Sequence, residues 1–314
     1  MESSPGALGA PGLISSALIL LVANPGLPGM GAATAVVVLG AAVAHAFWNA
    51  LAKQSPDQHV TFLWLNLAVG ALGLAGILAF GLPARAAIPF LLASVTVHLA
   101  YNLSLLNSYR FGDLSQVYPL ARGVAPVLVA IGAIAFAGET LSPPQLAAVA
   151  VTGVGLAGLA ELRRLGDSRN RAAVMLAGAT GLAIACYSLL DGLGVRRSGS
   201  PLAYAALLFT LEGLLVAPAI ALPQLRAGRP LTGSGTVQGA LAGAISWGAY
   251  AAVLWAQQRA PLAMVSALRE TSVLVAVAIG RLFLGEKLGT KRLIAGFAVG
   301  IGVIALLATG VHAR

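Results

Sequence analysis

The stretch from Gly112 to Pro126 reads GDLSQVYPLARGVAP, and the chain beyond it stays apolar as far as Phe136. An apolar run of this length is typical of a helix that crosses a membrane. This one nevertheless contains Arg122 and two prolines, Pro119 and Pro126. A buried arginine is costly in lipid unless it has a partner or faces water, and each proline removes a backbone donor. We therefore expect this helix to line a space inside the protein.

The composition places most of the chain in a membrane. The 314 residues are 58% hydrophobic and only 9% charged, whereas soluble proteins carry about 25% charged residues. The net charge of +9 is spread singly and in short groups between apolar runs. That pattern favours orientation in a membrane over binding to nucleic acid. Cys186 is the single cysteine, which argues against a disulfide framework or a cysteine metal site. We expect no metal and no cofactor.

The sequence predicts an all-α integral membrane protein with ten transmembrane helices, each about 20 residues long. The predicted spans are 33–53, 59–80, 86–108, 114–137, 143–161, 172–194, 202–222, 236–257, 262–284 and 290–309. Short polar or Gly/Pro-rich segments separate them, and the longest charged link divides the spans five and five. No segment between the spans is long enough to fold as a soluble domain.

The two halves of the chain repeat each other. Like residues lie 147 positions apart: Arg122 and Arg269, Gly138-Glu139 and Gly285-Glu286, Leu141 and Leu288, Gly153 and Gly300, and Gly155 and Gly302. Earlier in the repeat, Trp48 matches Tyr187, and Ser55-Pro56 matches Ser200-Pro201. Because five is an odd number of spans, the second copy must insert upside down. Inverted repeats place a substrate site near the membrane midplane and allow alternating access.

The predicted organisation has four parts. An N-terminal extension covers residues 1–30, the first repeat 31–162, a basic linker 163–171, and the second repeat 172–310. Met30 directly precedes the first convincing span, so the extension is interpreted as an over-extended gene start. An additional hydrophobic segment or a signal sequence is the alternative.

Several motifs resemble those of the EamA family of the drug/metabolite transporter superfamily. In the first half they are His45-Ala46-Phe47-Trp48-Asn49 with Lys53, and Gly112-Asp113-Leu114-Ser115 leading to Tyr118-Pro119-Leu120-Ala121-Arg122-Gly123. In the second half they are Leu268-Arg269-Glu270-Thr271-Ser272, and both halves carry a Gly-Glu pair. The similarity covers residues 33–309. It implies a ten-helix carrier, often an exporter of amino acids, metabolites or drugs, with a central cavity between two five-helix halves.

The charge pattern and the resemblance differ on orientation. Loops after odd-numbered spans hold most of the basic residues, including Lys53, Arg110 and the group from Arg163 to Arg171. The positive-inside rule then places both ends of the ten-helix core outside the cytoplasm. The resemblance implies both ends inside. We favour the orientation given by the charges.

Polar and aromatic residues form stripes on several spans, which predicts a cavity suited to a small organic molecule. The candidate substrate-binding residues are His45, Trp48, Asn49, His98, Tyr101, Asn102, Tyr118, Arg122, Tyr187, Trp247, Tyr250 and Arg269. Each also has a structural interpretation, because polar residues can simply join helices and aromatic residues near span ends can act as interfacial anchors.

The charges inside the spans have two interpretations. Glu270 or Glu212 could pair with an arginine of the other half, which would satisfy both charges. Alternatively, Arg122 or Arg269 could hold a substrate carboxylate or phosphate, whose geometry the guanidinium fork matches. Asp191, Glu212 and Glu270 are the candidates for proton coupling. Glu139 and Glu286, in the Gly-Glu turns, are interpreted as structural.

The predicted function is secondary transport, with export favoured, of small metabolites, amino acids or drugs across the bacterial cytoplasmic membrane. The driving force would be a proton gradient or the gradient of the substrate. The sequence has no phosphate-binding Gly-Lys-Ser/Thr loop and no catalytic motif of the common hydrolases. We therefore expect no enzymatic activity, although an intramembrane enzyme, a channel and a scaffold remain alternatives. The expected partners are the substrate and the bilayer, and Gly296-x-x-x-Gly300 would also allow a homodimer.

Overall fold

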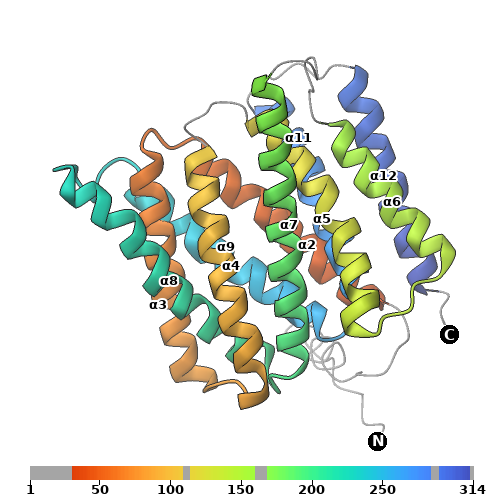
Figure 1. The fold of residues 1–314 in the computed structure, drawn as a ribbon, viewed down its shortest axis with the longest axis horizontal. Coiled ribbons are helices and arrows are strands. Elements are labelled where there is room, and N and C mark those ends of the chain that lie inside the picture. Colours follow the sequence, from red (N-terminus) through yellow and green to blue (C-terminus); the bar gives the residue numbers. More distant parts are fainter. Residues whose placement is uncertain (1–29, 109–113, 160–167, 284–289, 312–314) are drawn as a thin grey trace, which may run out of the picture.

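The computed structural model describes residues 30–108, 114–159, 168–283 and 290–311, and within these ranges the regular structure is entirely helical (Figure 1). The first half contains α2 (Ala32–Lys53), α3 (Gln58–Phe80), the short 3-10 turn η1 (Arg85–Ala87), α4 (Ile88–Ser108), α5 (Leu114–Ala137) and α6 (Pro143–Gly158). The second half contains α7 (Ser168–Arg196), α8 (Pro201–Arg226), α9 (Thr236–Gln257), α10 (Leu262–Arg269), α11 (Thr271–Phe283) and α12 (Thr290–Val311).

These helices follow the predicted spans closely, with two differences. The span predicted for 262–284 is two helices, α10 and α11, interrupted at Glu270. In addition, α7 begins at Ser168, within the segment predicted as a linker. Within the described residues, six helices are long and apolar enough to cross a membrane: those beginning at Ala32, Gln58, Arg85, Gly178, Pro201 and Thr236. The predicted extension at residues 1–30, apart from Met30, lies outside the described residues, as do Glu286 and Leu288.

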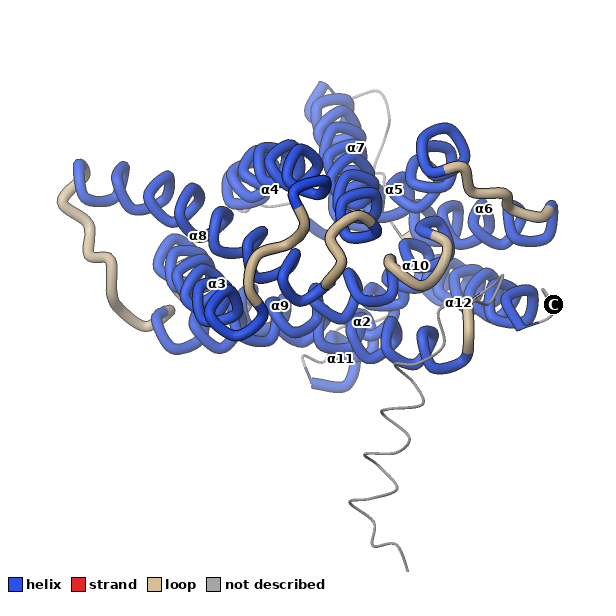
Figure 2. Tube along the Cα trace, turned by 90° about the horizontal axis from the view of Figure 1, so that it is seen from below, coloured by secondary structure: helices blue, strands red, loops and turns tan. Residues whose placement is uncertain are grey.

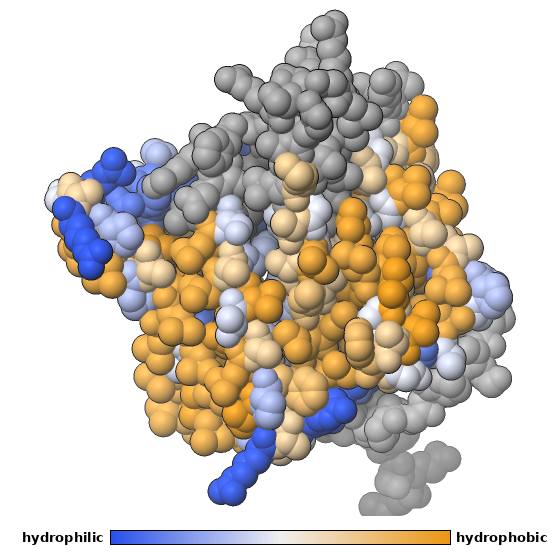
Figure 3. Space-filling view, viewed as in Figure 1, coloured by the Kyte–Doolittle hydropathy of each residue, from blue (hydrophilic) through white to orange (hydrophobic). Residues whose placement is uncertain are grey.

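The outer surface is apolar, as expected of a protein surrounded by lipid. Large hydrophobic side chains point outward from both halves, among them Leu78, Phe136 and Phe297. The side chain of Leu78 is 84% exposed, a fraction that would be unfavourable in water for a surface made largely of such residues. In Figure 3, hydrophobic residues cover most of the visible face, and hydrophilic residues gather toward its margins. The chain is therefore an integral membrane protein.

The last helices of the two halves, α6 and α12, pack against each other along one edge of the molecule (Figure 1). Small residues allow this close approach, since a Cβ atom added at Gly155 would lie 2.8 Å from the Val299 backbone nitrogen. Residue numbers rise along α6 as those of its partners on α12 fall, so the two helices run antiparallel. Equivalent positions make the same contact in reverse: Gly155 with Val299 and Ala295, and Gly302 with Thr152 and Ala148.

The second helices of the two halves, α3 and α8, form a similar pair near the opposite edge. Gly70 meets Gly213, and further along α3, Gly73 meets Thr210 and Gly76 meets Ala206. This pair also runs antiparallel. The loops at its two ends fix their positions, because the Ala84 N–H donates to the Ser198 carbonyl at one end and Trp64 Nε1 donates to the Leu231 carbonyl at the other.

The remaining helices lie between these two pairs (Figure 2). The first helix of each half packs on the third helix of the other, α2 on α9 and α7 on α4. The fourth elements pack likewise, α5 on α7 and α10 with α11 on α2. Exchanging the two halves therefore reproduces the arrangement. The centre of the molecule is built from both halves, and the polar residues of the interior gather there.

The close contact between α6 and α12 gives a matched stability test. A Cβ atom at Gly302 would lie 2.9 Å from the Ala148 carbonyl oxygen, whereas one at Gly300 would meet nothing within 4 Å. We expect Gly302→Ala to destabilise the protein by about 1–3 kcal/mol, as overpacking does. Gly300→Ala, two residues away on the same helix, should leave the melting temperature in detergent unchanged or raise it, because alanine favours a helix. Equal melting temperatures for the two variants would contradict this packing.

Candidate functional site

A cavity at the centre of the molecule is walled by both halves of the chain. Measured as the space open to the centres of water molecules, it is about 70 Å³, enough for several waters or one end of a small ligand. It is lined by His45, Trp48, Phe62, Leu65, Val69, His98, Tyr101 and Asn102 from the first half, and by Tyr187, Phe209, Glu212, Ser246, Tyr250 and Arg269 from the second. The wall is thus aromatic and apolar with a few charged groups, which is typical of a small-molecule site.

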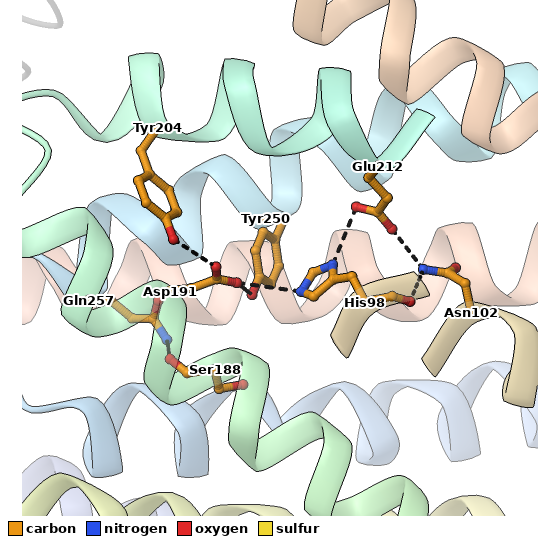
Figure 4. Close-up of polar contacts among 8 residues, drawn as sticks. All are labelled: His98, Asn102, Ser188, Asp191, Tyr204, Glu212, Tyr250 and Gln257. Atoms are coloured by element: carbon orange, nitrogen blue, oxygen red, sulfur yellow. Dashed lines mark hydrogen bonds and ion pairs between the residues drawn. The ribbon is translucent and has the colours of Figure 1, made fainter. Parts of the chain in front are cut away.

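One polar group of this site is centred on His98. The ring of His98 on α4 lies between two carboxylates of the second half (Figure 4). Its Nε2 is 3.4 Å from Asp191 Oδ2 on α7, and its Nδ1 is 3.3 Å from Glu212 Oε2 on α8. All three side chains are buried. These residues, with Asn102, Tyr204 and Tyr250, are called the His98 cluster below.

The other members of the His98 cluster donate hydrogen bonds to the same carboxylates (Figure 4). The Tyr204 hydroxyl donates to Asp191 Oδ1 at 3.1 Å, and the Tyr250 hydroxyl donates to Asp191 Oδ2 at 2.5 Å. Asn102 Nδ2 donates to Glu212 Oε1 at 2.7 Å. Each carboxylate is thus held by donors from a neighbouring helix, as buried ionised groups require.

A second polar group joins the halves at Arg122. This arginine of α5 forms a buried ion pair with Glu270, between α10 and α11, at 2.9 Å. It also contacts Nε2 of His45 on α2. Of the interpretations given for the buried charges, the pairing of Glu270 with an arginine of the other half is the one that this contact agrees with. Arg122 and Glu270 do not line the cavity. Their charges therefore neutralise each other inside the protein and do not face a ligand in the cavity.

The position of Glu270 follows from the break in the helix. The N–H of Glu270 bonds to the Ala267 carbonyl, and the Val273 N–H bonds to the Glu270 carbonyl, each over three residues instead of four. The Thr271 hydroxyl donates to the Leu268 carbonyl. Such a tightened turn interrupts the regular ladder. Broken helices at the centre of membrane transporters commonly mark the binding site.

Arg269 is the arginine that lines the cavity. Its side chain ends α10, is only 6% exposed, and lies 5.4 Å from the centre of the Tyr250 ring. Within the described part of the chain, Arg269 Nη1 has no hydrogen-bond partner. With His45 and Tyr250, Arg269 also lines a smaller neighbouring pocket between α2 and α9. The two arginines related by the sequence repeat therefore differ, since Arg122 is ion-paired and Arg269 faces the cavity.

Most of the residues proposed from the sequence for substrate binding meet at the cavity, but three of the described ones have other positions. Asn49 donates back to the His45 carbonyl along its own helix. Trp247 packs against Phe209, with ring centres 6.4 Å apart, and does not line the cavity. Arg122 belongs to the ion pair described above. The side chain of Tyr118 lies outside the described residues.

Glu139 has a structural position, which agrees with its interpretation from the sequence. Its Oε1 accepts from Arg196 at 2.7 Å and from the Leu262 N–H at 2.7 Å. Arg196 also donates to the carbonyls of Gln257 and Ala260. The turn after α5 is thereby tied to the end of α7 and to the start of α10.

Sequence reasoning missed some members of the site. Tyr204, which bonds Asp191, lies near the start of α8 among apolar residues, where its spacing gave no signal. Phe209 and Ser246 line the cavity from α8 and α9. Glu212 is one turn away from Phe209 on α8, so a helical projection outward from Glu212 would have located that side of the cavity.

Comparison with known families identifies the second half. Residues 171–308 match the model of the EamA-like transporter family. This part of the chain is an EamA-like transporter domain. It belongs to the drug/metabolite transporter superfamily, whose members are membrane transporters. The EamA-like domain contains Asp191, Glu212, Tyr250, Arg269 and Glu270, the second-half contributors to both polar groups.

Comparison with solved structures extends the likeness to the first half. One crystal structure of a protein superposes with a TM-score of 0.70 over 88% of this chain and 98% of the other, at 16% sequence identity. The EamA-like domain and the half that precedes it therefore share their fold with a protein of known structure. A search of curated proteins finds no match.

The Arg122–Glu270 pair predicts a strong non-additivity of substitutions. Glu270→Gln removes the negative charge that Arg122 contacts, and Arg122→Gln removes the positive charge beside a buried carboxylate. Each substitution should cost about 3–5 kcal/mol, as breaking a buried pair does. The double variant should recover a large part of this loss. Melting temperatures in detergent would measure the cycle.

The Arg196–Glu139 pair provides the comparison for this cycle. It is shorter, at 2.7 Å, but Arg196 is 27% exposed, so the same pair of glutamine substitutions should show a smaller coupling. Additive effects at Arg122 and Glu270 would mean that the two side chains do not depend on each other.

Proposed function

We propose that the protein is a secondary carrier that exports a small organic molecule across the bacterial cytoplasmic membrane by alternating access. The observation that carries this proposal is the central cavity, whose wall is shared by the two halves of the chain and contains Arg269. A site shared in this way can open to either side if the halves rock against each other.

Alternating access needs two halves of opposite sense, and we propose that the chain is a ten-span inverted repeat. The antiparallel pairing of α6 with α12, and of α3 with α8, supports it, because these helices hold equivalent positions in the two halves. Two copies inserted in the same sense would bring equivalent helices together in parallel.

The substrate would carry an oxyanion, such as a carboxylate or a phosphate, and an apolar body. Arg269 supports the first part, since it is buried, faces the cavity and has a guanidinium nitrogen without a partner among the described residues. A guanidinium fork matches two oxygens of such a group. The rings of Tyr101, Tyr187 and Phe209 supply an aromatic wall for the second part.

The driving force in this proposal is a proton gradient, with the gradient of the substrate itself as the alternative. A channel would also conduct the substrate, and an enzyme would alter it, but neither would exchange it. Counterflow, in which unlabelled substrate on one side accelerates uptake of labelled substrate from the other, is specific to a carrier and therefore separates the three functions.

The test uses purified protein in liposomes and benzenesulfonate as the probe, because a sulfonate stays ionised and offers the same pattern of oxygens. Vesicles loaded with unlabelled benzenesulfonate should transiently accumulate the radiolabelled compound, whereas the uncharged analogue benzenesulfonamide should not compete. Arg269→Gln should weaken the exchange by about ten- to a hundred-fold, the value of a charged hydrogen bond.

Arg259→Gln is the matched control for this variant. Arg259 also lies over an aromatic ring, that of Trp255 at 4.4 Å, but it follows α9 and does not line the cavity. The Arg259→Gln variant should exchange benzenesulfonate at the same rate as the wild type. Equal loss in both variants, or no counterflow of any oxyanion by the wild type, would remove the proposed substrate class. A homodimer through α12 stays a prediction.

A further inference from the structure

The buried charges of the described interior do not balance. Among the described residues with buried side chains, Arg122 and Arg269 carry positive charges, and Asp191, Glu212 and Glu270 carry negative charges. One further positive charge is needed for neutrality, which a group surrounded by lipid strongly favours. His98 is the histidine of this interior that lies against carboxylates.

The hydrogen bonds of the His98 cluster indicate where that charge is placed. An ionised carboxylate accepts but cannot donate, and both carboxylates already accept from neighbours. Asp191 accepts from Tyr204 and Tyr250, and Glu212 accepts from Asn102. Nδ1 of His98 lies within hydrogen-bond distance of Glu212 Oε2, at 3.3 Å, and Nε2 lies 3.4 Å from Asp191 Oδ2, at ion-pair distance but without the geometry of a hydrogen bond. A neutral ring would turn an unprotonated nitrogen toward one of these two carboxylates, so the arrangement favours the ring that carries a proton on both nitrogens.

Among the described residues, the groups around the cluster supply no other compensating cation. On its own helix, His98 is accompanied by Asn102 and Tyr101, and α3 contributes only the apolar side chains Phe62, Leu65 and Val69 to the cavity. Tyr187 on α7 and Tyr250 on α9 face the ring of His98 edge-on. Arg269 and His45 line the same cavity, but the first lies over Tyr250 and the second contacts Arg122.

We propose that His98 is the proton-binding group of this carrier, held between Asp191 and Glu212 across the interface of the two halves. The proposal rests on the proposed transport function and assigns the coupling proton to a place separate from the Arg122–Glu270 pair. His98 belongs to α4 of the first half, and both carboxylates belong to the second. Movement of one half against the other separates the ring from its carboxylates and admits water, and the proton then leaves Nδ1 or Nε2 for that water.

Nitrogen NMR of the full-length protein in lipid, labelled at histidine, tests where the proton sits without any substrate. The chain has four histidines, and the His98→Gln variant assigns the signal that disappears. At about pH 8, where an ordinary histidine is neutral, His98 should give the signal of a doubly protonated ring. Glu212→Gln, which keeps the size of the side chain, should convert that signal to the neutral form. A neutral His98 in the wild type would overturn the proposal.

Transport under a pH gradient tests whether this proton is the coupled one. The readout is the ratio of benzenesulfonate flux with the gradient to flux without it, so a change in basal rate does not affect it. The wild type should show a ratio of about five or more, within the usual range of coupling between sites, and His98→Gln should bring the ratio to one. His59→Gln, a histidine outside the cavity, should keep the wild-type ratio.

The two experiments distinguish a failure of the role of His98 from a failure of the proposed carrier function. A His98→Gln variant that keeps the wild-type ratio would overturn the role of His98 while leaving the carrier function in place. If the wild type exchanges no benzenesulfonate, the proposed substrate class fails, and the NMR spectrum alone still supports or overturns the protonation of His98.

Discussion

The structure depends on one constraint, which is that charges buried in a membrane protein must be paired. Among the described residues, the ion pairs at its centre join the two halves. Arg122 on α5 pairs with Glu270 between α10 and α11, and His98 on α4 lies between Asp191 and Glu212 on α7 and α8. A half folded alone would lose these ion pairs in lipid. Each half therefore supplies the charges that pair with those of the other half, and the interface between the halves must contain polar residues.

The same constraint links packing to the proposed mechanism. Glycine-lined contacts hold α6 on α12 and α3 on α8 at the two edges, and they can act as fixed supports because they contain no charge. The centre is held by ion pairs and hydrogen bonds, which can exchange protons, water and ligand. In the proposed mechanism, a substrate oxyanion at Arg269 and a proton at His98 would both act on the ion pairs and hydrogen bonds of the centre.

Much of the fold could be predicted from the sequence, because apolar runs of membrane length and the repeat of Arg122 by Arg269 are local and periodic signals. The break at Glu270 could not, since no proline or glycine between Leu262 and Ile279 marks it in the sequence. The cavity was predicted in outline from stripes of His45, His98 and Tyr187. Two features could be found only from the three-dimensional structure: Arg122 is ion-paired whereas Arg269 lines the cavity, and Tyr204 bonds to Asp191. Sequence spacing does not determine which helices meet, so it could not predict these contacts.

The most direct test of the account concerns the opposite insertion of the two halves. The loops after α2 and after α7 hold equivalent places in the repeat and lie at opposite ends of the α3–α8 pair. In a variant lacking Cys186, the one cysteine of the chain, a single cysteine replaces either Gln54 or Arg197, both exposed. A membrane-impermeant maleimide applied to intact cells should label one of these two variants and reach the other only after the membrane is opened. Labelling of both from the same side would contradict the inverted arrangement.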